Sequence, residues 1–230
     1  MWRPGSVSLL LLTAVVLGGC DGSPNGDVTA GQGDATTVNG SVRVPAGTHS
    51  GAVGTVNGAV TIGENASVTS AKVVNGPVEL SANASAGSVK AVNGAIELGS
   101  GAKVTGEITS VNGAVTLASG ADVTGQVTNV NGHISMTDAH VGGGLRTVTG
   151  DIDVKGSSRL EGGILVEKAV SSFFNTGSSH KPRIVIGPGA VVQGDLKFER
   201  DVDLYVSDKA TIGPVQGAKA IAFSGDAPPG

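Results

Sequence analysis

The sequence predicts an all-β chain that folds as a single-stranded parallel β-helix, a solenoid of three-sided coils. First, a Val-Asn-Gly tripeptide or a near-copy of it occurs seven times at intervals of 18 or 19 residues, which is typical of stacked repeats. Second, Val60-Thr61-Ile62 and Ile96-Glu97-Leu98 alternate with the two-residue period of β-strands. Third, no stretch of the repeats keeps the 3.6-residue period of an amphipathic helix.

Each interval of 18 or 19 residues is long enough for three short strands and three corners. Equivalent residues then stack on the next coil at about 4.8 Å, and the repeats amount to roughly ten coils in a rod on the order of 45–50 Å long. Right-handed winding is preferred over left-handed. The 38 glycines and 3% aromatic content suit glycine corners around a narrow aliphatic interior. A meander of hairpins is the structural competitor, because Asn-Gly is also a strong hairpin signal.

The N-terminus predicts export and lipidation. Arg3 precedes an apolar run at 9–17, which is too short to span a bilayer but is typical of a secretory signal peptide. The run ends in Leu17-Gly18-Gly19-Cys20, which contains the only cysteine and resembles the lipobox of bacterial lipoproteins. The resemblance implies removal of residues 1–19 and a lipid on Cys20. The alternative is an ordinary exported protein with a cysteine near its cleavage site.

Residues 20–36 contain almost no large apolar side chain and are predicted to be the lipidated cysteine and a flexible tether. Two or three acyl chains on Cys20 would hold the protein in a membrane, because each buried methylene contributes about 0.8 kcal/mol. The lipobox resemblance therefore implies a membrane partner and a location at the bacterial cell envelope. Asp21 resembles the inner-membrane retention signal of enterobacterial lipoproteins, which leans towards the inner over the outer membrane.

Residues 37–170 are the Val-Asn-Gly repeats, and their asparagines are predicted to be structural. Glycine has no Cβ and asparagine tolerates the left-handed region, so each Asn-Gly is expected to form a corner with positive φ. Stacked asparagine side chains can hydrogen-bond from coil to coil as an amide ladder. Ligand binding by the same amides is the alternative. The predicted ladder consists of Asn39, Asn57, Asn75, Asn93, Asn112 and Asn131.

The C-terminal part changes character. Residues 171–182 interrupt the period and are predicted to be an inserted loop, after which repeat-like sequence resumes over 183–223. An open solenoid end exposes backbone and core, so the aromatics gathered here are expected to cap the last coil, with a binding site as the alternative. Residues 224–230 are predicted to be disordered. The aromatics are Phe173, Phe174, Phe198, Tyr205 and Phe223.

A family resemblance rests on a pattern that recurs at 102–108, 121–127 and 190–196: Ala-x-Val-x-Gly-x-aliphatic. This pattern resembles the bactofilins, polymer-forming bacterial cytoskeletal proteins built on a three-sided right-handed β-helix. The resemblance implies a structural protein that self-associates end to end into filaments and has no catalytic residues to carry over. Bactofilins are usually cytoplasmic, whereas this chain has an export signal. The Val-Asn-Gly half also resembles adhesin repeats of bacterial surface proteins.

The sequence argues against an enzyme. Residues 62–66 and 186–190 resemble the hexapeptide repeats of left-handed β-helix acyltransferases, yet no histidine recurs with a base partner. No serine or cysteine stands beside a base in the pattern that nucleophilic catalysis needs. We expect no catalytic residue, no metal site and no cofactor, and we expect the histidines to be solvated surface residues. They are His49, His133, His140 and His180.

The charges predict outward rows rather than a binding stripe. Net charge is −4 without a basic patch, which speaks against nucleic acid as a partner. Glu79 and Glu97 are expected to stack on one row, with Thr61, Thr116 and Ser135, and Lys72 and Lys90 on another. Like charges at this spacing repel, and a cation bridging the glutamates is the alternative to simple solvation. The threonine rows are broken, which argues against ice binding.

These features predict a lipid-anchored structural or scaffolding protein of the bacterial cell envelope that forms polymers, with an envelope protein or cell-wall component as a further partner. The competing prediction is a surface adhesin or binding module that presents its β-helix faces to an envelope or extracellular partner.

Overall fold

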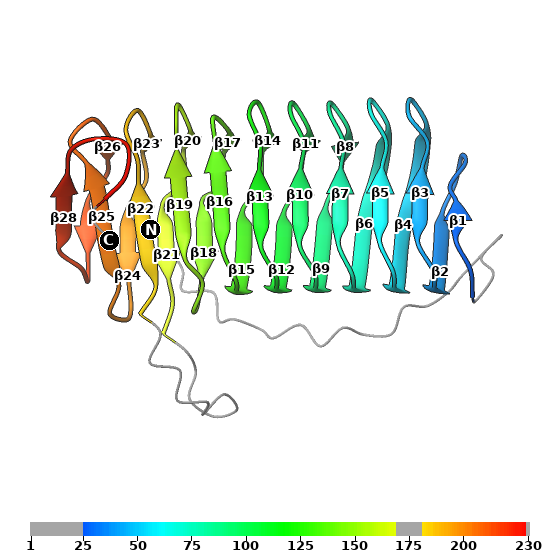
Figure 1. Ribbon diagram of the computed structural model, residues 1–230, viewed down its shortest axis with the longest axis horizontal. Helices are drawn as coiled ribbons and strands as arrows, with labels where there is room; N and C mark the ends of the chain where they lie inside the picture. Colours follow the sequence, from blue (N-terminus) through cyan, green and yellow to red (C-terminus); the bar gives the residue numbers. More distant parts are fainter. Residues whose placement is uncertain (1–24, 169–180, 229–230) are drawn as a thin grey trace, which may run out of the picture.

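The computed structural model describes residues 25–168 and 181–228, which form a rod of parallel strands (Figure 1). Strands pair in register from one coil to the next, as in Ile96↔Val115 and Ile108↔Val127, and these pairings are parallel. A hairpin meander would pair its neighbouring strands antiparallel, so that competitor is excluded. The predicted all-β parallel solenoid is confirmed.

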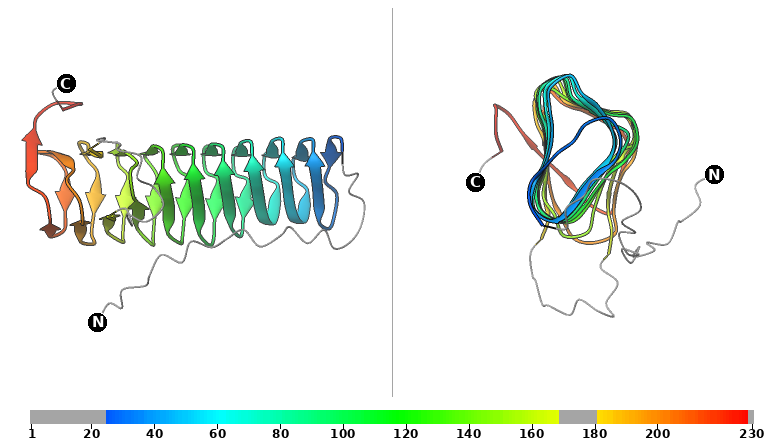
Figure 2. Two further views of the ribbon diagram at one scale, coloured as in Figure 1. Left: turned by 90° about the horizontal axis from the view of Figure 1, so that it is seen from below. Right: turned by 90° about the vertical axis from the view of Figure 1, so that its right-hand side faces the viewer.

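Each regular coil contributes three strands, one to each of three faces. In one central coil β10 (Ile96–Leu98) lies on the first face, β11 (Lys103–Val104) on the second, and β12 (Ile108–Asn112) on the third. Seen along the rod, successive coils superimpose (Figure 2). The first-face sheet has 11 strands, so at about 4.8 Å per step the rod is about 48 Å long.

The strands of the first face form one sheet in chain order. They are β1 (Val28–Thr29), β3 (Val42–Val44), β5 (Val60–Ile62), β7 (Val78–Leu80), β10, β13 (Val115–Leu117), β16 (Ile134–Thr137), β19 (Ile152–Lys155), β22 (Arg183–Ile186), β25 (Asp203–Ser207) and β28 (Ala220–Phe223).

The second and third faces share a 17-stranded sheet, because two long strands run across both faces. These long strands are β4 (His49–Asn57) and β6 (Ser67–Asn75). The second face continues with β8 (Ser85–Ala86), β11, β14 (Asp122–Val123), β17 (His140–Val141), β20 (Arg159–Leu160), β23 (Val191–Val192) and β26 (Thr211–Ile212). The third face comprises β2 (Ala35–Asn39), β9 (Val89–Asn93), β12, β15 (Val127–Asn131), β18 (Leu145–Thr147), β21 (Ile164–Val166), β24 (Leu196–Phe198) and β27 (Val215–Gln216).

The core is a continuous column of aliphatic side chains inside the coils. Alternation on the first face points Ile96 and Leu98 inward, where both are almost fully buried, and leaves Glu97 outside. Burying a side chain of this size is worth about 1.5–3 kcal/mol, and every coil repeats the contribution. Because each coil covers the next, the stack rather than the single repeat is the stable unit.

Positive φ recurs at two corners of the coil and also occurs at Gly33 and Gly144 in the third corner, and the expectation for asparagine is wrong at the first. At the Val-Asn-Gly corner the glycine alone has positive φ, as at Gly58 (149°), while its asparagine ends the third-face strand. The second corner lies between the first and second faces, where Asn65 (55°) and Asn83 (56°) take the left-handed conformation. Glycine fills that corner in other coils, as at Gly101 (69°). Asparagine is tolerated there because its short polar side chain suits this region.

The first coil begins at Asn25, so the predicted tether over residues 20–36 is wrong for residues 25–36. Val28 is the only larger apolar side chain among these residues and packs against the core, while Ala30 and Ala35 fill inward positions and are buried. Two aspartate carboxylates of this coil accept hydrogen bonds from backbone N–H groups of the next coil, in place of backbone carbonyls. Asp27 Oδ1 accepts from Ser41 N, and Asp34 Oδ1 accepts from Ala52 N, each at 2.7 Å.

The C-terminal coils continue the same stack. β19 pairs directly with β22 through Ile152↔Ile184, and β21 pairs with β24 through Ile164↔Leu196, so the extra chain length between β21 and β22 interrupts neither sheet. Most of the predicted loop at 171–182, with Phe173 and Phe174, lies outside the described residues. Residues 224–228 contain no strand or helix.

Only one of the three described aromatics lies at the end of the rod, where the aromatic cap was predicted. Phe198 is an inward residue of the core, because it occupies an inward position of β24. Tyr205 faces outward beneath the Arg183 guanidinium, whose Cζ lies 5.2 Å from the ring centroid. Among the described aromatics only Phe223 belongs to the terminal strand, where it is buried.

Candidate functional site

The asparagines of the Val-Asn-Gly corners form one row of side-chain hydrogen bonds along the rod. In each step the Nδ2 amide donates to the Oδ1 of the preceding coil. Asn75 donates to Asn57 at 2.9 Å, and Asn93 donates to Asn75 at 3.0 Å. The whole row comprises Asn25, Asn39, Asn57, Asn75, Asn93, Asn112 and Asn131. We call it the asparagine row.

The row begins one coil earlier than the sequence analysis placed it, and it ends at Asn131. Asn39 donates to Asn25 at 2.6 Å, and an Asn-Gly dipeptide at 25–26 was the available signal for this residue. At the other end, the Asn131 amide is 3.5 Å from Asn112 Oδ1, the longest step of the row. Thr149 Oγ1 then donates to Asn131 Oδ1 at 3.3 Å, because threonine replaces asparagine in the seventh tripeptide.

The glycine after each asparagine is required by the stacking. A Cβ on Gly76 would lie 2.0 Å from the carbonyl oxygen of Gly58, in the coil below. The Gly58 N–H also donates to the carbonyl of Asn75 at 3.0 Å, which ties the corner to the next coil. Backbone and side chain therefore hold each corner together, so the Asn-Gly pair has a complete structural explanation.

The valines of the same tripeptides are not explained by the structure in the same way, because they do not point into the core. As apolar residues of a repeat with an aliphatic interior, Val56, Val74 and Val92 would be expected to point into the coil. In the structure they are half-buried and point outward next to the asparagine row, because the inward position of the strand is the residue before them. Seven valines share this position: Val38, Val56, Val74, Val92, Val111, Val130 and Val148. We call them the valine row.

A polar row inside the rod lies behind these valines, and the sequence analysis did not single it out. Thr37 and Thr55 donate their hydroxyls to the carbonyls of Gly26 and Gly40 at 3.0 and 2.8 Å. Asn129 donates to the Gly113 carbonyl at 2.9 Å and is fully buried. The signal was a polar residue two positions before the corner asparagine, where an aliphatic residue is otherwise expected.

The outward charges stack as the repeat spacing predicted. Glu79 pairs in register with Glu97, and Lys72 pairs with Lys90. Lys90 Nζ lies 2.6 Å from Glu107 Oε1, so an ion pair across coils offsets part of the repulsion between the lysines. The described glutamates of this row carry no cation ligand set with neighbouring His, Cys, Asp or Glu side chains.

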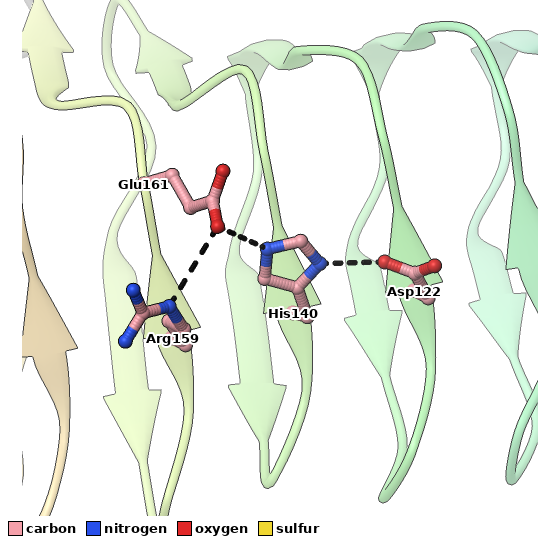
Figure 3. A network of polar contacts seen from close by, with 4 residues as sticks. All are labelled: Asp122, His140, Arg159 and Glu161. Atoms are coloured by element: carbon pink, nitrogen blue, oxygen red, sulfur yellow. Dashed lines mark hydrogen bonds and ion pairs between the residues drawn. The ribbon is translucent and has the colours of Figure 1, made fainter.

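His140 belongs to a network of polar contacts on the second face (Figure 3). Its Nδ1 lies 2.6 Å from Asp122 Oδ1 in the preceding coil, and its Nε2 lies 3.4 Å from Glu161 Oε1 in the following coil. Arg159 Nε is 3.7 Å from the same glutamate oxygen. The imidazole is about one-third exposed and contacts side chains of both neighbouring coils, so this surface histidine joins a row of polar side chains across three coils.

The other described histidines make single polar contacts. His49 Nδ1 lies 2.5 Å from Ser67 Oγ, and His133 Nε2 lies 3.7 Å from Asp153 Oδ2. His180 lies outside the described residues. No group of three or more His, Cys, Asp or Glu side chains within residues 25–168 and 181–228 is arranged to hold a metal ion.

Two ion pairs of the C-terminal coils shift the protonation of their members. A hydrogen bond to Asp203 raises the pKa of Lys181 above its ordinary value. A hydrogen bond from Lys197 lowers the pKa of Glu199 below its ordinary value. Both pairs are largely exposed, so they act as surface contacts between and within coils rather than as a catalytic pair.

The predicted lipidation site cannot be placed on the rod. Cys20, with Leu17, Gly18 and Gly19 before it, lies outside the described residues, as does Asp21. Within the described part of the chain, no helix is long and apolar enough to cross a membrane.

Comparisons with known proteins add no relationship to this geometry. The chain matches no family model, no curated protein and no solved structure. The function must therefore be argued from the rod, its rows and the N-terminal sequence.

Proposed function

We propose that the protein is a lipid-anchored structural rod of the bacterial cell envelope. The observation that carries the proposal is the combination of a lipobox-like Leu17-Gly18-Gly19-Cys20 with a stiff parallel solenoid directly after it. Like residues form rows along the described part of the rod, and the hydrogen bonds of the asparagine row join one coil to the next up to Asn131. Such an architecture suits a spacer or scaffold, because stacked coils form a long and rigid body.

The position of the first coil defines how the rod would be held. Cys20 and Asn25 are five residues apart in the chain, so their Cα atoms lie at most about 18 Å from each other. A lipid on Cys20 would thus keep the N-terminal end of the solenoid close to the membrane surface. The C-terminal coils, about 48 Å along the rod, are the end free to reach further into the envelope.

The anchor is tested by replacing Cys20 with serine in a bacterial host that processes lipoproteins. We expect metabolic palmitate labelling of the wild-type chain, recovery in the membrane fraction, and loss of both in Cys20→Ser. A matched control, Ser23→Cys in the Cys20→Ser background, moves the thiol away from the lipobox and is expected to stay unlabelled. Equal labelling of wild type and Cys20→Ser would refute the anchor.

Assembly of the rod into polymers is the finer part of the proposal, supported by the bactofilin-like pattern at 102–108, 121–127 and 190–196. Negative-stain electron microscopy and sedimentation of the mature chain over a range of concentrations test it. Filaments that lengthen with concentration are the expected result. A single monomeric species at every concentration would refute polymerisation.

A binding module is the second candidate, and the valine row favours it. Seven valines repeat on the outside of the rod beside exposed amides, although the core does not need them. A regular apolar row next to a polar row is suited to an extended partner surface. Replacing Val74, Val92 and Val111 together by threonine tests this role. Loss of retention on isolated envelope, with unchanged thermal unfolding, would favour the binding module over the scaffold.

A further inference from the structure

The six Asn-Gly corners from 39 to 132 have the same dipeptide sequence, but hydrogen bonds protect them unequally against deamidation. The difference singles out one asparagine. Asparagine followed by glycine is prone to deamidation, because the glycine nitrogen can attack the side-chain amide without hindrance from a Cβ. The attack needs that nitrogen to lose its proton and the amide to move towards it. Hydrogen bonds on the glycine N–H and on the asparagine amide therefore oppose the reaction.

Five of these corners have both restraints. The glycine N–H donates to the asparagine carbonyl of the next coil at Gly40, Gly58, Gly76, Gly94 and Gly113, over 2.9 to 3.2 Å. The asparagine amides of the same corners donate to the preceding coil at 2.6 to 3.0 Å. Cyclisation at any of them requires the corner to separate from both neighbouring coils.

The corner at Asn131-Gly132 lacks the first restraint and has the weakest form of the second. Among the described residues, the Gly132 N–H has no hydrogen-bond acceptor. The cause is the next coil, where Thr149 and Gly150 replace Asn-Gly. There Thr149 N–H donates back to the Val130 carbonyl at 3.0 Å, and Gly150 N–H donates to Thr147 Oγ1 at 2.9 Å.

The side-chain amide of Asn131 is also held more weakly than the others. Asn131 is exposed like the other corner asparagines, but its amide lies 3.5 Å from Asn112 Oδ1, the longest step of the asparagine row. Both the glycine nitrogen and the asparagine amide group are thus less restrained here than in the other five corners, while Asn131 Oδ1 still accepts from Thr149 Oγ1 at 3.3 Å.

We propose that Asn131 is the site at which the folded protein undergoes spontaneous deamidation. A base removes the proton from the Gly132 nitrogen, which forms a bond to Cγ of Asn131. The Cγ–Nδ2 bond breaks, and the amide nitrogen takes up a proton and leaves as ammonia. Water then opens the five-membered succinimide at either carbonyl, which yields aspartate or isoaspartate at position 131. No redox partner is involved.

The product changes the rod at the end of its regular half. A carboxylate at position 131 no longer donates to Asn112 Oδ1, and it places the first charge in a row of neutral amides. Isoaspartate also adds a methylene to the backbone of a corner that must stack on its neighbours. We expect the contact between the coils of Asn112 and Asn131 to weaken with the age of the protein.

The test uses the purified full-length mature chain, incubated at mildly alkaline pH in the native state and, in parallel, unfolded in guanidinium chloride. Peptide mass spectrometry then follows aspartate plus isoaspartate at each Asn-Gly. In the native chain we expect Asn131 to react about tenfold faster than the other corners or more, as one lost hydrogen bond corresponds to roughly this factor. In the unfolded chain the six rates converge, because the protection has gone.

Two controls make the result decisive. Asn131→Gln is expected to remove the fast native reaction without changing the rates elsewhere, since glutamine would have to form a larger ring. Asn75→Gln leaves the fast reaction at Asn131 in place. The proposal is overturned if another corner reacts fastest in the folded chain, or if the ratio of native to unfolded rate is the same for all six.

Discussion

The asparagine row predicts a measurable loss of stability when it is interrupted at its centre. Asn93 donates to Asn75 and accepts from Asn112, both at 3.0 Å. Asn93→Ala removes both hydrogen bonds. Each is worth about 0.5–1.5 kcal/mol net, and exposure to water places these bonds near the lower end. We therefore expect the free energy of unfolding to fall by about 1–2 kcal/mol. For a chain of this size, the melting temperature should fall by about 2–4 °C for each kcal/mol.

Urea unfolding followed by circular dichroism measures this change, with m-values compared to check that the transition stays cooperative. The matched control is Thr116→Ala, an exposed outward residue of the next coil whose hydroxyl makes no hydrogen bond within the described residues. Its cost should stay within about 0.5 kcal/mol, as for ordinary surface substitutions. If Asn93→Ala costs no more than this control, the row does not hold the coils together.

Three further predictions follow from corners, core and surface. Gly76→Ala should prevent stable stacking of its coil, because φ is 142° and the new Cβ would lie 2.0 Å from the Gly58 carbonyl oxygen, and limited proteolysis would detect this. Ser110→Ala should raise the melting temperature, since the buried Ser110 hydroxyl has no partner among the described residues and removing it relieves about 1 kcal/mol. The pKa of Glu199 is lowered, so the stabilisation by its carboxylate is present above the ordinary pKa of 4.5 and is lost as pH falls through the folded pKa. In a curve of the free energy of unfolding against pH, Glu199→Gln should therefore flatten the acidic side. Lys197→Met should have the same effect, because it removes the hydrogen bond that lowers the pKa.

Repeat arithmetic was enough to predict which outward residues become neighbours. A fixed interval of 18 or 19 residues brings Glu79 beside Glu97 and Lys72 beside Lys90 without any knowledge of the coil's shape. Parallel stacking transmits the sequence period directly into space, so register is the most predictable property of such a fold. The predicted solenoid follows from the same argument.

Orientation at the corners was less predictable, because it depends on where a strand stops alternating. Val56 looked like a core residue, yet Thr55 is the inward residue and Val56 lies outside. Likewise Asp27 resembles a tether residue in sequence, and only the fold shows its carboxylate taking the place of a missing strand at Ser41 N–H. Local composition does not reveal that a side chain accepts a hydrogen bond that a backbone carbonyl of a neighbouring strand would otherwise accept.

The coils of the two halves of the rod are joined by different kinds of side-chain interaction. Up to Asn131 the surface contacts between coils are mainly neutral amides of the asparagine row, with Lys90–Glu107 as an ion pair. Beyond Asn131 ion pairs also join the described coils: Arg146 with Glu167 is mostly buried, whereas Lys181 with Asp203 is more exposed. Salt screens such exposed charges but leaves amide ladders largely unaffected.

This division has a mechanical consequence. At high ionic strength the C-terminal coils should open before the Val-Asn-Gly coils, and hydrogen exchange should lose protection there first. The boundary falls at Asn131, where the row of amides ends and the Gly132 N–H has no described partner. A rod anchored near Cys20 would then keep its membrane-proximal half rigid in varying salt, while its distal half responds to the ionic conditions of the envelope. Equal salt sensitivity of exchange in both halves would contradict this view.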